Sequence, residues 1–98
     1  MNILCCDDDP IVKEALRVYM KEEGYMTTFA SDGEEALLAF RSANPDFIVL
    51  DIMMPKKNGL EVCKEIRKES DVPILILTAK GEVIDRILGF VLGADDYI

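Results

Sequence analysis

The chain has 98 residues, half of them hydrophobic, and its 19 acidic and 11 basic residues give a net charge of −8. This length suits one small domain and is too short for two. The acidic balance argues against direct nucleic-acid binding, which needs clustered Lys and Arg, and favours basic or cationic partners. No apolar run approaches the ~20 residues that cross a bilayer, and no basic segment precedes an apolar one at the start. We therefore expect a cytoplasmic protein that does not contact a membrane.

Three cysteines are present, and their spacing contains no Cys-x-x-Cys pair. Cys5 and Cys6 lie in an apolar run, Cys63 lies in a helical pattern, and the chain has no His that could act as a co-ligand. We expect buried, reduced thiols rather than a disulfide or a zinc site.

Apolar runs and helical patterns alternate along the chain. Strands are predicted over residues 2–6, 25–30, 47–50 and 73–77 and from residue 97, and helices over residues 10–23, 34–43, after 59 and about 82–92. The first helix has Asp9 as its expected N-cap and Pro10 at its first position, and it ends at Gly24. In the next two helices the apolar spacing predicts these inward side chains: Ala36, Leu37, Phe40, Leu60, Cys63 and Ile66.

The strands lack polar alternation, and a helix follows each of the first four. This pattern is typical of an α/β fold with a parallel sheet that is covered on both faces. Because crossovers between parallel strands are right-handed, few topologies remain possible. We expect a single domain over residues 1–98.

Polar residues stand where three of the strands end. Asp7 and Asp8 follow the first strand, Asp51 follows the third, and Thr78 follows the fourth. The carboxyl ends of parallel strands form the ligand-binding edge of open α/β sheets, so these side chains should converge. Neighbouring carboxylates repel one another unless a cation lies between them, and hard oxygen ligands suit Mg²⁺. A carboxylate, a metal ion and a hydroxyl together can receive a phosphoryl group.

Each of these features alone has an ordinary explanation. An acidic triplet at a helix start is usually a cap that complements the helix dipole, so its functional prior is roughly one in five. An Asp after an apolar strand is often only a solvated terminus, and a Thr there carries little information. Their joint occurrence at the same end of consecutive strand–helix units favours a functional site.

Four segments resemble response-regulator receiver domains in order and spacing. They are residues 3–9 (ILCCDDD), 49–59 (VLDIMMPKKNG), 76–79 (ILTA) and 93–97 (GADDY). The resemblance covers the whole chain. It implies a flavodoxin-like three-layer sandwich with a parallel sheet of order 2-1-3-4-5.

The resemblance also implies the site. Asp51 matches the phosphorylated aspartate, and Asp7 and Asp8 match the acidic pair. Together with Asp51 and the backbone carbonyl of Met53, this pair would bind Mg²⁺. Asp9 matches a looser acidic position and is interpreted here as a helix cap.

Three further residues match the part of the family motif that responds to phosphorylation. Thr78 would be the switch hydroxyl that bonds to the phosphoryl oxygen, and Ala79 must be small to leave the phosphoryl path open. Tyr97 matches the aromatic switch residue. The implied function is phosphoryl transfer from a sensor histidine kinase, which then controls an output domain. The receiver would not be an enzyme beyond its own phosphotransfer and autodephosphorylation.

The chain departs from the family pattern at its last residues. Receiver domains carry a Lys two or three positions past the aromatic switch residue, and then a final helix, whereas this sequence stops at Ile98. We therefore expect a receiver that is truncated in the fifth strand and lacks the fifth helix. An alternative is a phosphorylation-impaired structural or dimerisation module, and we expect a homodimer or a truncation-induced oligomer.

The predicted fourth helix carries more apolar residues than one buried stripe needs. It resembles the receivers attached to winged-helix DNA-binding domains, which dimerise through this region. Ile84, Leu88, Asp95 and Asp96 are the expected interface residues. Contact with DNA would occur only through an output domain that the sequence does not contain, and the regulated process would be transcription.

Two other classes of protein are compatible with parts of the pattern. A phosphohydrolase with a nucleophilic Asp needs a second Asp two residues later as general acid, but position 53 is Met. A flavin-binding carrier of the same topology needs a first loop rich in Ser, Thr or Gly, and an acidic first loop would repel the flavin phosphate.

Overall fold

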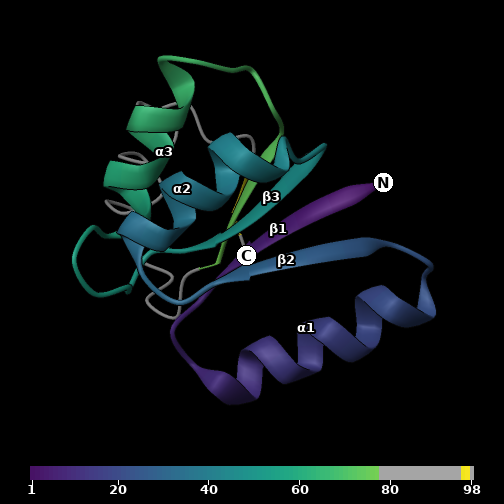
Figure 1. Cartoon of the computed structure of the whole chain (residues 1–98). Coiled ribbons are helices and arrows are strands. Elements are labelled where there is room, and N and C mark those ends of the chain that lie inside the picture. The colour runs from purple at the N-terminus through teal and green to yellow at the C-terminus, as the bar shows by residue number, and fades with distance from the viewer. Residues whose placement is uncertain (78–95, 98) are drawn as a thin grey trace.

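The computed structural model describes residues 1–77 and, as backbone only, residues 96–97 (Figure 1). The predicted fourth helix lies outside the described residues. The same holds for Thr78, Ala79, Ile84, Leu88 and Asp95.

Strands and helices alternate in the predicted order. The elements are β1 (Asn2–Cys6), α1 (Pro10–Glu22), β2 (Met26–Ala30), α2 (Gly33–Ala43), β3 (Phe47–Asp51), α3 (Gly59–Arg67), β4 (Ile74–Leu77) and β5 (Asp96–Tyr97). The predicted boundaries agree with the observed ones to within one residue at every end that can be compared. The second and fourth strands begin one residue later than expected, and the fifth occupies residues 96–97.

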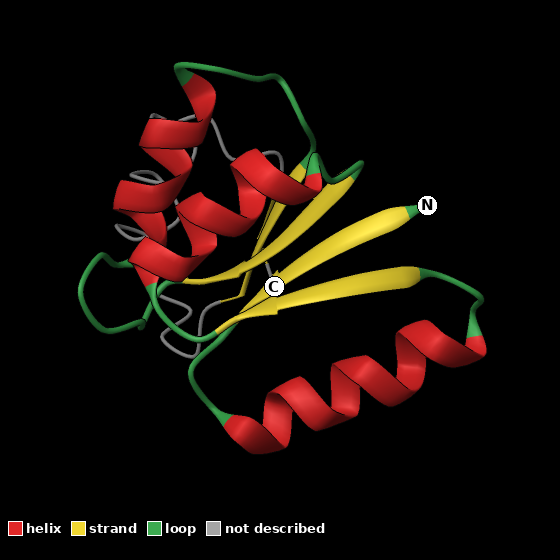
Figure 2. Cartoon of the chain, viewed as in Figure 1, coloured by secondary structure: helices red, strands yellow, loops and turns green. Residues whose placement is uncertain are grey.

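The strands form one parallel sheet of order β2-β1-β3-β4-β5, which confirms the predicted flavodoxin-like topology (Figure 2). β1 and β3 are neighbours at its centre, where Cys6 pairs with Leu50. Helix α1 covers one face of the sheet, and α2 and α3 cover the other (Figure 1). The chain leaves β1 and β3 at the same edge, so the residues that follow these strands meet there.

Each helix in the described part of the chain begins at a side-chain cap, so the loop that precedes it ends at a defined residue. The Asp9 carboxylate accepts a hydrogen bond from the Ile11 N–H at 2.9 Å and is followed by Pro10 at the first helical position, as predicted. Asp32 caps α2 through the Glu35 N–H at 2.8 Å. Such caps contribute about 1 kcal/mol each.

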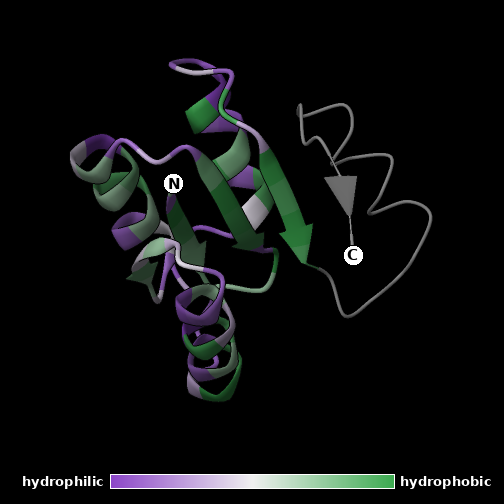
Figure 3. Ribbon diagram, turned by 90° about the vertical axis from the view of Figure 1, so that its right-hand side faces the viewer, coloured by the Kyte–Doolittle hydropathy of each residue, from purple (hydrophilic) through white to green (hydrophobic). Residues whose placement is uncertain are grey.

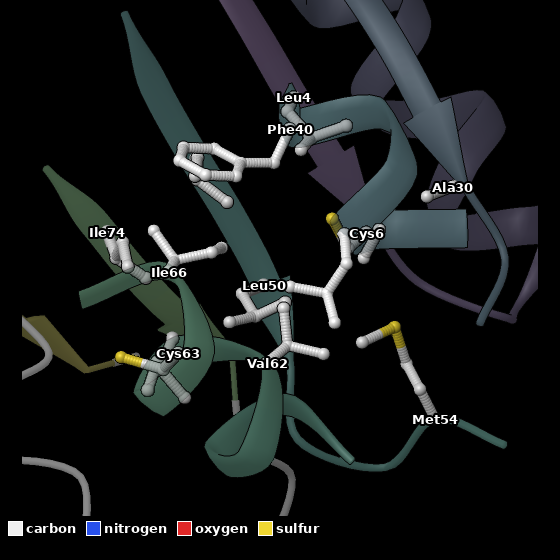
Figure 4. Close-up of a cluster of buried hydrophobic side chains, with 14 of the residues drawn as sticks. Leu4, Cys6, Ala30, Phe40, Leu50, Met54, Val62, Cys63, Ile66 and Ile74 are labelled. Carbon is white, nitrogen blue, oxygen red and sulfur yellow. The ribbon is translucent and has the colours of Figure 1, made fainter. Parts of the chain in front are cut away.

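The larger part of the core lies between the sheet and helices α2 and α3 (Figure 4). Its fully buried side chains include Leu4, Ile48, Leu50, Val62, Ile66, Ile74 and Ile76. Ala36, Leu37, Phe40, Cys63 and Ile66 are buried as predicted. Leu60 is only partly buried at its edge.

A smaller cluster lies on the α1 face of the sheet. It consists of Ile3, Cys5, Met20 and Val49 among the buried residues. The remaining apolar side chains of α1 are less buried, and Ile11 and Tyr19 are 79% and 57% exposed. Figure 3 shows the contrast, with β4 coloured as hydrophobic while α1 is mixed.

None of the three cysteines forms a disulfide, and all three are buried, as expected. Burial raises the pKa of the Cys5 thiol to about 11 and also raises the pKa of Cys6. Among the helices in the described part of the chain, none has the length and apolar character needed to cross a lipid bilayer.

Candidate acidic site at the carboxyl edge of the sheet

The end of β1 positions two of the predicted carboxylates. The Asp7 N–H donates to the Ala30 carbonyl of β2 at 3.0 Å, so its backbone is still tied to the neighbouring strand. Its side chain is 4% exposed, and one carboxylate oxygen accepts the Asp9 N–H at 2.9 Å. Asp8, the next residue, is exposed. The first loop therefore presents one buried and oriented carboxylate and one solvated carboxylate.

The end of β3 positions the third carboxylate. Directly after Asp51, the Ile52 N–H donates to the Leu77 carbonyl at 3.2 Å, and the Gly59 N–H donates to the Ile52 carbonyl at 2.9 Å. A Cβ at position 59 would lie 2.2 Å from the Asp51 carbonyl oxygen, so the start of α3 can approach the strand only because residue 59 is glycine. The Met53 N–H donates to Oδ1 of Asp51 at 3.3 Å.

These two strand ends bring Asp7, Asp8 and Asp51 together. Each offers a carboxylate oxygen, and the three oxygens lie within 4.8 Å of one another. Three negative charges at this separation repel each other, and a divalent cation between them would remove the repulsion. The predicted convergence is therefore present in the fold for the three carboxylates.

The electrostatics of the cluster follow from burial and from the crowding of like charges. The pKa of Asp7 is raised mainly by burial and further by the Asp8 and Asp9 carboxylates, against the lowering effect of the Asp9 N–H. The pKa of Asp51 is also raised mainly by burial, with contributions from Asp7 and Asp8, against the Met53 hydrogen bond. Both carboxylates are thus less easily ionised than in solution, which is the state that a bound cation would reverse.

One basic residue near the cluster was not anticipated from the sequence. The Lys13 ammonium donates a hydrogen bond to the Ser31 hydroxyl, which joins α1 to the loop after β2. Its charge makes a small lowering contribution to the pKa of Asp7, which burial raises overall. Lys13 stands one helical turn after Asp9. This spacing from the helix start is the feature of the sequence that could have indicated a basic residue near the cluster.

The other predicted site residues are only partly within the described residues. Asp96 and Tyr97 form β5, whose backbone pairs with Leu75 and Ile76 of β4. Thr78 and Ala79, which follow β4, lie outside the described residues, as do the expected interface residues Ile84, Leu88 and Asp95. The Met53 side chain is 56% exposed beside Asp51.

A doubly wound parallel sheet with three carboxylates gathered at the ends of its two central strands defines the receiver class of signalling domain. The family model "Response regulator receiver domain" matches residues 3–98, and the chain belongs to this family.

Two of its relatives carry names that describe gene regulation. It is 54% identical to "Probable transcriptional regulator ycf27" of Pyropia yezoensis, over 99% of this chain and 40% of that protein. It is 46% identical to the DNA-binding response regulator MtrA of Mycolicibacterium smegmatis, over 99% of this chain and 42% of that protein. The chain thus spans about two fifths of the length of these relatives.

A solved structure gives the same picture of the fold. The BeF3-activated N-terminal receiver domain of Klebsiella pneumoniae RstA superposes with a TM-score of 0.96 at 31% identity, over 100% of this chain and 84% of that one.

Proposed function

We propose that this receiver accepts a phosphoryl group on the carboxylate of Asp51 in the presence of Mg²⁺. The observation that carries the proposal is the approach of the Asp7, Asp8 and Asp51 oxygens to within 4.8 Å of one another. The repulsion within such a cluster destabilises the fold unless a cation binds there, and clusters of this kind are typical of functional sites. Asp51 is the acceptor because its carboxylate ends a central strand and is only partly buried, whereas Asp7 is buried.

The donor set fits Mg²⁺. Asp7, Asp8 and Asp51 supply hard carboxylate oxygens, and the backbone carbonyl of Met53 is the further ligand that we propose. Bound Mg²⁺ would neutralise the carboxylates and the charge on the phosphoryl oxygens.

The chain's own residues then orient and perform the transfer. The Met53 N–H holds Oδ1 of Asp51, which leaves the second oxygen of that carboxylate available for attack. This oxygen attacks the phosphorus of a phosphohistidine, an O–P bond forms, and the P–N bond breaks. The imidazole leaves with the bonding electron pair and is protonated by solvent. The product is an acyl phosphate on Asp51.

The donor that we propose is a sensor histidine kinase, and the output is control of transcription through a DNA-binding domain outside this chain, in the cytoplasm. The names of the relatives support this assignment. We propose Thr78 and Tyr97 as the switch pair, with Ala79 leaving the phosphoryl path open. A homodimer through Ile84, Leu88, Asp95 and Asp96 belongs to the same proposal.

The arrangement argues against turnover of a small substrate. A phosphohydrolase would need a general acid two residues after its nucleophile, and that position holds the thioether of Met53. The receiver would therefore act only on itself, by accepting the phosphoryl group and later losing it to water. A structural or dimerisation module with an inactive site is the second candidate, and the labelling experiment below separates the two.

The test is the intact mass of the protein after incubation with acetyl phosphate and Mg²⁺. We expect one phosphoryl group on the parent, none on Asp51→Asn, and none on the parent when EDTA replaces Mg²⁺. Asn is the matched control because it keeps the shape and the Oδ1 acceptor for the Met53 N–H while removing the charge.

Equal labelling of Asp51→Asn would show that another residue accepts the group. No labelling of the parent at any Mg²⁺ concentration would favour the structural module.

A further inference from the structure

The loop between β3 and α3, residues 52–58, is held against the start of α2. The Pro55 carbonyl accepts two hydrogen bonds, one from the Lys57 N–H at 2.8 Å and one from the Gly33 N–H at 3.2 Å. The second bond joins segments that are more than twenty residues apart in the sequence. The start of α2 thus binds the backbone of the loop directly, at the turn between Pro55 and Lys57.

The turn itself has an unusual backbone. Lys56 has a φ of +68° and stands between the donor and the acceptor of the Lys57–Pro55 hydrogen bond, which makes a γ-turn with a left-handed central residue. Non-glycine residues adopt this φ rarely and keep it only where surrounding contacts impose it. The Lys56 ammonium lies 3.6 Å from the carboxylate of Asp32, the N-cap of α2, and 3.7 Å from that of Glu34 in its first turn.

Gly33 permits this close approach. A Cβ at position 33 would lie 2.2 Å from the Lys57 carbonyl oxygen and 2.3 Å from the Lys57 Cβ. These distances are far shorter than any real contact, so a side chain at position 33 would displace the loop. Since Gly33 is the first residue of α2, an alanine there is otherwise compatible with the helix.

The same loop carries the group that orients Asp51. Met53 lies two residues before Pro55, and its N–H holds Oδ1 of the Asp51 carboxylate. Between them, Met54 is 7% exposed in the core and donates its N–H to the Ile52 carbonyl at 3.1 Å. The loop is therefore anchored in the core at Met54 and on α2 at Pro55, directly after the residue that contacts the acceptor.

We propose that Gly33, Asp32 and Lys56 are positioning residues for the phosphoacceptor site, because docking of the β3–α3 loop on the start of α2 fixes Met53 beside Asp51. The inference rests on the proposed function and assigns to α2 a part in it. None of the three residues belongs to the acidic cluster itself.

The inference is testable at Lys56. An electrostatic role and a positioning role of this residue predict opposite changes in the affinity for Mg²⁺ when it is replaced. Lys56→Met removes a positive charge from the loop that carries Met53, so a purely electrostatic role predicts tighter binding of Mg²⁺. A positioning role predicts weaker binding, because the turn loses its contact with Asp32 and Glu34. Lys57→Met is the matched control, since it removes the same charge one residue further along the same loop.

The experiment measures the backbone amide shifts of the metal-free protein by NMR and then the Kd for Mg²⁺ alone by titration. In Gly33→Ala we expect displaced amide signals at residues 51–57 and a Kd weakened about tenfold, as for other contacts that orient metal ligands. In Lys56→Met we expect a Kd weakened about threefold, as suits an exposed ion pair. In Lys57→Met the Kd should be unchanged or slightly tighter.

The outcomes are distinguishable from failure of the proposed function. If the parent binds Mg²⁺ and is phosphorylated, but Gly33→Ala and Lys56→Met bind Mg²⁺ as tightly as the parent, the positioning role is wrong and the phosphoacceptor function stands. Tighter binding by Lys56→Met would also overturn it, in favour of a charge effect. If the parent itself does not bind Mg²⁺, both proposals fail. Should Gly33→Ala lose its dispersed spectrum, Lys56→Met, which introduces no clash, decides the question.

Discussion

The interior of the sheet and its carboxyl edge are built from the same central strands. Residues 3–6 of β1 and 48–50 of β3 are apolar and almost completely buried, with Leu4, Ile48 and Leu50 at 0% exposure. One residue beyond each strand's last apolar position, the chain places Asp7 and Asp51, which lie close to one another and to Asp8. Side chains are buried both in the interior and at the edge. Burial stabilises the fold in the interior and destabilises it at the edge.

In the interior, burial removes apolar surface from water and stabilises the fold by about 25 cal/mol for each Å². At the edge, burial removes carboxylates from water beside other carboxylates, and the pKa values of Asp7 and Asp51 are raised as a result. The strands thus supply the stability that lets the edge hold an arrangement unfavourable in the absence of a cation. Four predictions test this contrast, beginning with the largest effect.

The first prediction compares matched residues on the two faces of the interior. Ile48 faces α2 and α3, Ile3 faces α1, and both lie on central strands. Ile48→Ala should lower the free energy of unfolding by about 4 kcal/mol and Ile3→Ala by about 2 kcal/mol, both within the range for such cavities. The difference is expected because α2 and α3 close over Ile48, whereas α1 packs less completely. Urea denaturation measures both, and an equal loss would show that the faces are equally well packed.

The second prediction concerns the edge in the presence of a cation. Mg²⁺ at about 100 times its Kd should raise the free energy of unfolding by about 2.7 kcal/mol, because it binds only the folded cluster. Thermal unfolding with Mg²⁺ and with EDTA measures the effect. Asp7→Asn should abolish most of the gain, and a gain that persists in this variant would place the cation elsewhere.

The third prediction concerns the edge without a cation. Asp7 and Asp51 have a higher pKa when folded than when unfolded, so between the two values the folded state binds more protons. The stability of the metal-free protein should therefore fall as the pH rises above the ordinary Asp value and through the raised values. Asp7→Asn should be more stable than the parent at neutral pH by on the order of 1 kcal/mol, and the difference should disappear near pH 3. If the parent were the more stable at neutral pH, repulsion would not dominate the edge.

The smallest effect is expected on the outer side of α1. Tyr19 is 57% exposed, so Tyr19→Ser should change the free energy of unfolding by no more than about 0.5 kcal/mol. Urea denaturation provides the check. A loss of more than about 1.5 kcal/mol would mean that the α1 face contributes to the core more than its burial indicates.

Much of this arrangement could be predicted from the sequence. The elements follow from uninterrupted apolar runs and from local start and stop residues, such as Asp9 with Pro10 at the start of α1 and Gly24, with its φ of +81°, after its end. The convergence of Asp7, Asp8 and Asp51 follows from the rule that parallel strands present their carboxyl ends at one edge. These features depend on short stretches of chain or on topology, so no atomic detail was required.

What could not be predicted depends on contacts between distant segments. Gly33 looks like an ordinary turn glycine in the sequence, and its need for space appears only when Lys57 lies against it. Likewise the apolar spacing of α1 predicts a helix but does not specify how much of it is buried, and Ile11 proves to be 79% exposed. The hydrogen bond from Lys13 to Ser31 crosses between elements that only the tertiary fold brings together.

Because the three thiols are buried, their reaction with alkylating reagents would report local or global unfolding of the protein. Alkylating reagents attack the thiolate, and in the native state burial both shields Cys5, Cys6 and Cys63 and raises the pKa of the first two. Because Cys5 belongs to the α1 cluster while Cys6 and Cys63 belong to the α2–α3 cluster, each side of the sheet carries its own label. The order in which the sites are modified would therefore record which helical layer separates from the sheet first, without any introduced probe.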